Sequence, residues 1–382
     1  MSQKRSIFEE VEGQAPARGA TPKGGLIDRP RGARRGIRIW LAILFVMVLA
    51  MILVGGLTRL TDSGLSITEW KPVTGALPPM NAADWQSEFA LYQATPEYQL
   101  QNHGMSLGEF KSIYWWEWGH RQLGRFVGLV WALGFFGFLI ARRIPAGWTP
   151  RLLGIGLLGG LQGAIGWWMV SSGLTGSMVD VASYRLALHL GLAFAILGCI
   201  AWLIFLLGRS EADLLQARRM RDAKLMVKGS GLMHIAFLQI LLGALVAGID
   251  AGTTYTDWPL MGGQILPPQP FDLVPLWRNF FEDAGLVQFM HRLVAYGLFA
   301  YGLFAWSRGR ASANAAIRRA FNWVAILLLV QVLLGISTLM SGAALAYGLA
   351  HLFVAVLLFV AILRARFMAA YPPAQSIKGA KA

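Results

Sequence analysis

Four histidines lie at matching places in the two halves of this chain. His120 and His291 are each followed directly by arginine, and His189 and His351 lie in similar stretches of leucine and alanine or glycine. The chain has six histidines, so four of them follow this repeat. Paired imidazoles on apolar helices are typical axial ligands of a heme iron. The repeat therefore predicts two heme sites, one in each half.

One acidic residue breaks the match between the halves. Glu117 lies three residues before His120, whereas Gln288 lies three residues before His291. Residues at this spacing share one face of a helix. A carboxylate there can move protons or stabilise positive charge, and an amide cannot titrate. The alternative is an interfacial acid among neighbouring tryptophans. The asymmetry favours a reactive site in the first half and a resident, electron-carrying heme in the second.

Arginines accompany these histidines. Arg121 and Arg292 follow His120 and His291, and Arg125 lies one turn further along. Guanidinium groups suit the anionic propionates of a heme. Arginines that extend to the headgroup level of a membrane are the alternative, and both interpretations stay open.

The composition is that of a membrane protein. Of 382 residues, 55% are hydrophobic and only 14% are charged. Such a balance is too apolar for an ordinary soluble domain. The single cysteine, Cys199, excludes an intramolecular disulfide and a cysteine-based metal site, and we expect it to be a small core residue.

Apolar runs long enough to cross a bilayer predict an all-α integral membrane protein with eight transmembrane helices. The longest run, 320–363, is too long for one helix, and the small residues at 341–344 divide it in two. The other six expected helices cover 39–58, about 119–141, 152–179, 186–208, 229–249 and about 286–307.

Lysine and arginine predict the orientation of these helices. Both tails and every second connection are rich in them, whereas the alternate connections hold only Arg59, Lys71, Lys111 and Arg278. By the positive-inside rule, both termini are cytoplasmic. The four histidines then lie toward the outer, periplasmic side. The net charge of +14 is a topology signal, which argues against nucleic-acid binding.

The first helix and loop of each half also match. The matching residues are Gly55, Leu57, Asp62 and Gly64 in the first half, and Gly243, Leu245, Asp250 and Gly252 in the second. Each half has four helices, so both halves run the same way. We expect two pseudo-symmetric parallel four-helix bundles. The expected domains are a basic tail (1–36), a first bundle (37–208, with a long outer loop at 58–118), a linker (209–228), a second bundle (229–366) and a second tail (367–382).

Two segments resemble heme A synthases. Residues 55–66 (GGLTRLTDSGLS), continuing to 69–72 (EWKP), resemble the first outer-loop signature of that family, and 117–121 (EWGHR) resembles its second-helix motif. The resemblance covers roughly 35–367. With its single, unpaired cysteine the chain resembles the proteobacterial and mitochondrial branch of the family, because members of the other branch carry a cysteine pair in an outer loop.

The resemblance implies a reaction. Heme O would be oxidised at its C8 methyl group to a formyl group by two successive hydroxylations and loss of water, giving heme A for cytochrome oxidase. It implies that His120 and His189 bind substrate heme, that Glu117 is essential, and that His291 and His351 ligate a heme b cofactor. The expected setting is a bacterial inner membrane. Expected partners are a ferredoxin-like or quinol electron donor, heme O synthase and oxidase assembly factors.

Two other functions remain compatible with paired histidines. One is a di-heme b-type cytochrome that transfers electrons from quinol. The other is a heme carrier, although all four histidines lie toward one side. Small residues near 154–163 suit helix packing within the bundle or in a homo-oligomer.

Overall fold

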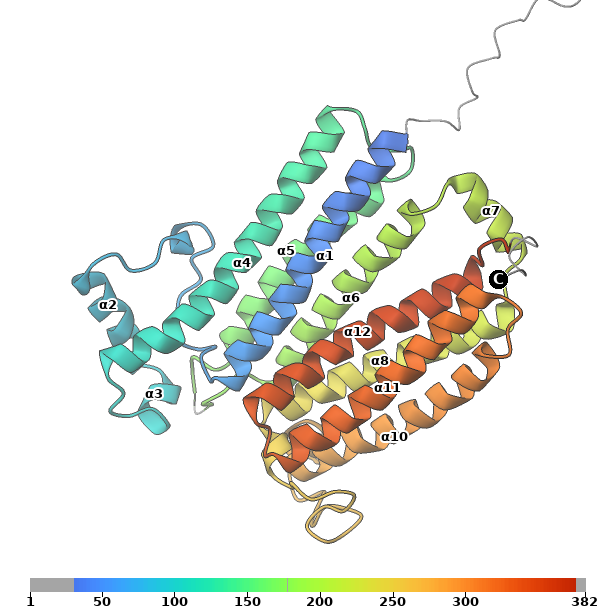
Figure 1. Ribbon diagram of the computed structural model, residues 1–382. Coiled ribbons are helices and arrows are strands. Elements are labelled where there is room, and N and C mark those ends of the chain that lie inside the picture. The colour runs from blue at the N-terminus through green and yellow to red at the C-terminus, as the bar shows by residue number, and fades with distance from the viewer. Residues whose placement is uncertain (1–30, 177, 376–382) are drawn as a thin grey trace, which may run out of the picture.

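A computed structural model describes residues 31–176 and 178–375 of the chain. Most of the two predicted tails, residues 1–30 and 376–382, therefore lies outside the described residues. Long helices run side by side (Figure 1), and no β-strand occurs in the described ranges. The long helices are α1 (Arg31–Leu60), α4 (Leu107–Ile140), α5 (Thr149–Val170), α6 (Ser183–Leu207), α8 (Ala223–Gly248), α10 (Ala284–Gly309), α11 (Ala315–Met340) and α12 (Leu345–Ala370).

Seven of these helices are long and apolar enough to cross a membrane. This finding confirms a helical, multi-pass membrane protein. α10 lies where we expected one more span and has 26 residues, but it is not among the seven. Its first turns carry Gln288, His291 and Arg292, which lower its apolar character.

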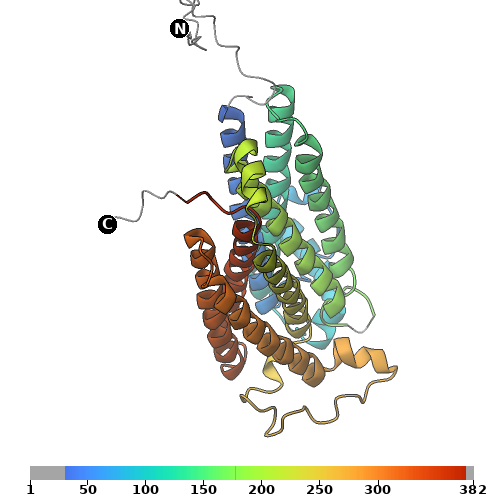
Figure 2. The ribbon, with the colours of Figure 1, turned by 90° about the vertical axis from the view of Figure 1, so that its right-hand side faces the viewer.

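The long helices form two sets of four. In the first set α1, α4, α5 and α6 contact one another in a ring, and in the second α8, α10, α11 and α12 do the same. α1, α6, α8 and α12 join the two sets (Figure 2). One buried apolar core continues across this boundary, where Phe194 of α6 meets Phe359 of α12 edge to face with ring centroids 5.7 Å apart.

α4 begins earlier than the apolar pattern predicted. We expected it to start near 119 with His120 in its opening turn, but it starts at Leu107 and His120 lies in its fourth turn. A capping box of Ser106 and Glu109 starts the helix. Phe110 and Tyr114 then pack beneath the short helices of the outer loop, α2 (Ala82–Gln93) and α3 (Pro96–Leu100). Tertiary packing therefore stabilises turns that lack a membrane-like sequence.

Other helix boundaries can be compared with those predicted from the apolar runs. The expected division at 341–344 is confirmed, because α11 ends at Met340 and α12 begins at Leu345. α5 ends at Val170 rather than at 179, since the backbone N–H groups of Ser171, Ser172 and Gly173 close turns on the last residues of the helix. The expectation for Cys199 was wrong: its side chain is exposed on the surface of α6.

Charged side chains connect the helices at one end of the two sets. At one end Arg34 of α1 pairs with Glu211 of α7 (Glu211–Arg219), and Arg209 donates to the carbonyl of Tyr371 after α12. α1 therefore begins and α12 ends at the same end of the molecule (Figure 1). The outer loop with α2 and α3 lies at the other end.

Candidate functional site

The four repeated histidines form two pairs in space. His120 of α4 interacts electrostatically with His189 of α6, and His291 of α10 does so with His351 of α12. In each set the two helices that carry the pair lie across the ring from each other. All four imidazoles are only partly buried. The structure thus brings together the pairs that the sequence repeat predicted.

Each imidazole lies against a glycine of a neighbouring helix. A Cβ atom on the glycine would come 2.8 to 3.1 Å from the Cε1 atom of the histidine, which is closer than a relaxed contact. The pairs are His120 with Gly55, His189 with Gly166, His291 with Gly243, and His351 with Gly335. Helical glycine costs about 1 kcal/mol relative to alanine. Here it leaves the space that each ring occupies.

Three of the four imidazoles also have a glutamine partner. The Nε2 atom of Gln162 lies 3.2 Å from Nδ1 of His189, and that of Gln239 lies 3.0 Å from Nδ1 of His291. Gln331 Nε2 lies 3.3 Å from Nε2 of His351. The Oε1 atoms of these three glutamines are buried without a hydrogen-bond partner.

These features fit a heme held by two histidines. A histidine that ligates a metal through one ring nitrogen carries N–H on the other and needs an acceptor for it. Each glutamine fixes its ring in place, because its Nε2 atom lies beside the ring and also donates to the backbone carbonyl of the same histidine. Nδ1 of His120 and Nδ1 of His351 have no hydrogen-bond partner among the described residues. No group of three or more acidic, cysteine or histidine ligands occurs in the described part of the chain. Paired imidazoles are therefore the donor set on which a metal group would depend.

Glu117 is buried, and each of its two carboxylate oxygens accepts two hydrogen bonds. Its Oε2 atom accepts from the Ser66 hydroxyl and the Ile67 backbone N–H, both at 2.7 Å. Its Oε1 atom accepts from Nε and Nη2 of Arg121 at 3.0 and 2.6 Å. The carboxylate therefore connects α4, one turn before His120, to the start of the outer loop.

Gln288 occupies the equivalent position in the second set. It donates hydrogen bonds to its loop, whereas Glu117 accepts them. Its amide donates to the carbonyls of Ala251 and Tyr255 at 2.8 and 3.0 Å. Its Oε1 atom accepts from Nη2 of Arg292 at 3.1 Å. Both halves thus hold their first outer loop through an (i, i+4) pair, but only the first half uses an ionisable acid.

The three candidate arginines are largely engaged with loop carbonyls. Arg121 donates to the carbonyls of Ile67 and Glu69, and Arg125 donates to those of Lys71 and Pro72. Arg292 donates to the carbonyls of Tyr255, Asp257 and Leu260. A guanidinium has five N–H donors. Arg121 has one left, and the Nε of Arg292 is buried without a partner.

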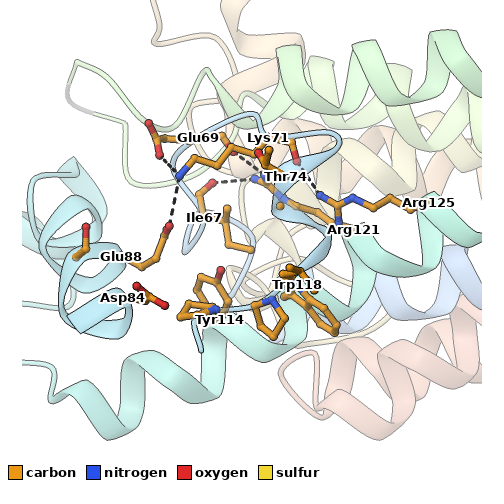
Figure 3. Close-up of a pocket in the computed structure, with 15 residues that line it drawn as sticks. Ile67, Glu69, Lys71, Thr74, Asp84, Glu88, Tyr114, Trp118, Arg121 and Arg125 are labelled. Atoms are coloured by element: carbon orange, nitrogen blue, oxygen red, sulfur yellow. Dashed lines mark hydrogen bonds and ion pairs between the residues drawn. The ribbon is translucent and has the colours of Figure 1, made fainter. Parts of the chain in front are cut away.

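A pocket of about 340 Å³ lies between α4 and the outer loop. Figure 3 shows Arg121 and Arg125 reaching from α4 toward the loop, where Lys71 pairs with Glu69 and Glu88. Trp118 also lines this pocket. Two of its lining residues, Trp118 and Arg121, flank His120 along α4.

Further acids gather near Glu117 and Arg59. Burial raises the pKa of Glu97, on α3, to about 8, with further contributions from Glu117, Asp180 and Asp62. Burial also raises the pKa of Asp180, which Arg59 opposes. The remaining histidines, His103 and His234, have exposed side chains and belong to neither pair.

The sequence interpretation missed the glutamines and the partners of Glu117. A signal for the glutamines exists, because Gln162, Gln239 and Gln331 each lie four residues before the glycine that faces the same imidazole. The corresponding residue before Gly55 is Met51. Ser66 lies in the loop segment used for the family resemblance, but its contact with Glu117 spans 51 residues and had no local signal.

Comparison with known proteins gives full-length matches. Residues 38–363 match a family model described as COX15-CtaA, cytochrome oxidase assembly protein. A heme A synthase of Dinoroseobacter shibae is 63% identical over 385 residues, covering 100% of both chains. The heme A synthase of Paracoccus denitrificans is 59% identical over 377 residues, covering 98% of this chain and 99% of its own.

Proposed function

The chain belongs to the COX15-CtaA family of cytochrome oxidase assembly proteins, and from this membership we propose that it is a heme A synthase. It is an oxidoreductase that acts on heme O and converts its C8 methyl group to a formyl group. Two successive hydroxylations followed by loss of water give heme A for cytochrome c oxidase. The observation that carries the proposal for the site is the pairing of His120 with His189 one turn from Glu117.

In this proposal α10 is the eighth span, so that each ring of four helices is one parallel, pseudo-symmetric bundle. The first comprises 37–208 and the second 229–366. The contact rings and the matching glycine and histidine positions support it. The basic connections support cytoplasmic termini in a bacterial inner membrane, with both heme sites toward the periplasm.

His291 and His351 would hold heme b, and His120 and His189 would hold heme O as substrate. Heme b, when bound, supplies one-electron transfer. Gly243, Gly335, Gln239 and Gln331 orient the two imidazoles on the heme b side. On the substrate side Gly55 and Gly166 leave room for the rings, and Gln162 orients His189. The free donors of Arg121, Arg125 and Arg292 would meet propionates.

Glu117 would act on the reacting end of the substrate. Its negative charge, held by Arg121, stabilises positive charge that develops during oxidation. Its Oε2 atom also accepts the hydroxyl proton of Ser66 and so marks the place where a proton can be taken up or passed on. Gln288 in the second half can do neither. This difference supports the assignment of the reaction to the first half.

Several partners follow from the reaction. Heme O comes from a farnesylating heme O synthase, and electrons come from a ferredoxin-like or quinol donor. Transfer to oxidase assembly factors and a homo-oligomer are part of the same proposal. Glycines without a close neighbour on α5, including Gly154, Gly159 and Gly163, are available for helix–helix packing.

The function is tested by hemes extracted from cells that lack their own heme A synthase but make heme O. We expect heme A to accumulate when this chain is expressed, and hemes separated by chromatography report it. Two tightly held b-type hemes with no heme A would instead indicate a di-heme electron-transfer cytochrome.

A further inference from the structure

The glutamine partner is missing at one imidazole. Gln162, Gln239 and Gln331 contact His189, His291 and His351, and each amide also donates to the backbone carbonyl of its histidine at 3.0 or 3.1 Å. At the equivalent position of α1, four residues before Gly55, the residue is Met51. Three rings therefore have an amide beside them, and for His120 the residue at the equivalent position of the sequence is a methionine.

Met51 cannot replace the amide. A thioether is only a weak acceptor and has no donor. The Met51 methyl group packs toward α4 near Gly124, one turn beyond His120, at 3.6 Å from the place of a Cβ on that glycine. In the described part of the chain the Nδ1 atom of His120 is buried without a hydrogen-bond partner, as is that of His351, but His120 has no glutamine amide beside its ring.

A second partner of a ligating histidine controls how firmly the metal is held. It fixes the ring orientation and raises the basicity of the ligand, and its loss typically weakens metal binding about 10- to 100-fold. Both imidazoles of the second half have a glutamine amide beside them, at Nδ1 of His291 and at Nε2 of His351. In the first half only His189 does.

We infer that Met51 makes His120 the exchangeable ligand of the first heme site, so that this site releases heme while the second site retains it. The inference rests on the proposed function, since a synthase must release one heme in each cycle and keep its cofactor. Met51 is a positioning residue in this scheme, because it acts through His120 and not on the reacting atoms.

Heme exchange tests the inference without measuring activity. Purified full-length protein is loaded with two equivalents of iron protoporphyrin IX and mixed with excess apomyoglobin as a heme trap. For the unchanged protein we expect a fast phase from the first site and a slow phase from the second. Met51→Gln should slow the fast phase about tenfold or more. Met51→Leu has no amide and should leave both phases unchanged.

The opposite exchange in the second half is the matched control. Gln239→Met should accelerate the slow phase about tenfold by removing the amide that lies beside His291. If Met51→Gln leaves the fast phase unchanged while Gln239→Met changes the slow one, the inference fails. It also fails if Met51→Leu slows release as much as Met51→Gln. Heme A is extracted from the same cells, so that its absence alongside the expected exchange rates would reject the proposed function and leave the exchange mechanism standing.

Discussion

Glu117 and Arg121 form a two-point ion pair on α4, in which Nε and Nη2 of the arginine both donate to Oε1 of the carboxylate. The same carboxylate holds the outer loop through Ser66 and Ile67. In the second half, Gln288 and Arg292 repeat the arrangement with a neutral amide. A charge is therefore present in one of two equivalent loop anchors, next to one of two equivalent imidazole pairs.

Glu117→Gln should abolish heme A formation while heme b stays bound. The amide keeps the size of the side chain but cannot carry charge or take up a proton, and loss of such a group costs about 100-fold or more in rate. Extracted hemes and the reduced heme b spectrum of the purified variant measure the two effects. Gln288→Glu is the control in the matching anchor and should keep heme A formation. Normal heme A from Glu117→Gln cells would show that the acid serves only as a loop anchor.

His291→Ala or His351→Ala should remove heme b from the purified protein. Each replacement leaves one axial ligand where the proposal requires two. The pyridine hemochrome spectrum gives the heme content per chain. His234→Ala on α8 is the control, because the His234 side chain is exposed and lies outside both pairs. An unchanged heme b content after either replacement would refute the ligand assignment.

Gly335→Ala should weaken heme b binding about tenfold, since overpacking costs about 1–3 kcal/mol. The new methyl group would lie 3.0 Å from Cε1 of His351, so the ring must shift. Titration with iron protoporphyrin IX measures the affinity. Gly297→Ala on α10 is the matched control, because a Cβ there has no atom within 4 Å. Equal affinities for the two variants would show that the contact between Gly335 and His351 has no role.

Arg59, at the end of α1, links the two halves, and its loss should destabilise the protein. Its guanidinium lies 2.6 Å from Asp62 and Asp250 and 3.6 Å from Asp180. Arg59→Met leaves three carboxylates without their shared cation, which we expect to cost about 1–3 kcal/mol for this partly buried cluster. Thermal unfolding should show a deficit that is larger at pH 8 than at pH 5, because burial raises the pKa of Asp180 and loss of the opposing Arg59 charge favours its protonation at the lower pH. Asp84→Asn, on the far side of the outer loop, should have no such pH-dependent deficit.

Glu97 should make the outer loop less stable as pH rises. Burial raises the pKa of its carboxyl in the folded protein to about 8, well above the value of an exposed glutamate. The folded state then binds more protons than the unfolded state between about pH 4.5 and pH 8, so stability falls across this window and levels off above it. Glu97→Gln should remove the fall. Unfolding followed by tryptophan fluorescence across pH 5–9 checks it, and a parallel pH slope in both proteins would contradict it.

The linear sequence determined much of the fold and the site. Apolar runs placed the long helices, and the break at 341–344 was placed correctly because small residues there interrupt a continuous run. The internal repeat identified His120, His189, His291 and His351 and paired them as the structure does. These features depend on periodicity and on the repeat, which are readable along the chain.

Only the tertiary structure decided what surrounds these residues. It extended α4 back to Leu107 by packing Phe110 and Tyr114 under the outer loop, and it directed Arg121 and Arg125 mainly to loop carbonyls. It also placed the amides of Gln162, Gln239 and Gln331 beside three of the four imidazoles. Such contacts join residues that are distant in the chain, and their geometry depends on how whole helices pack, which no local pattern encodes.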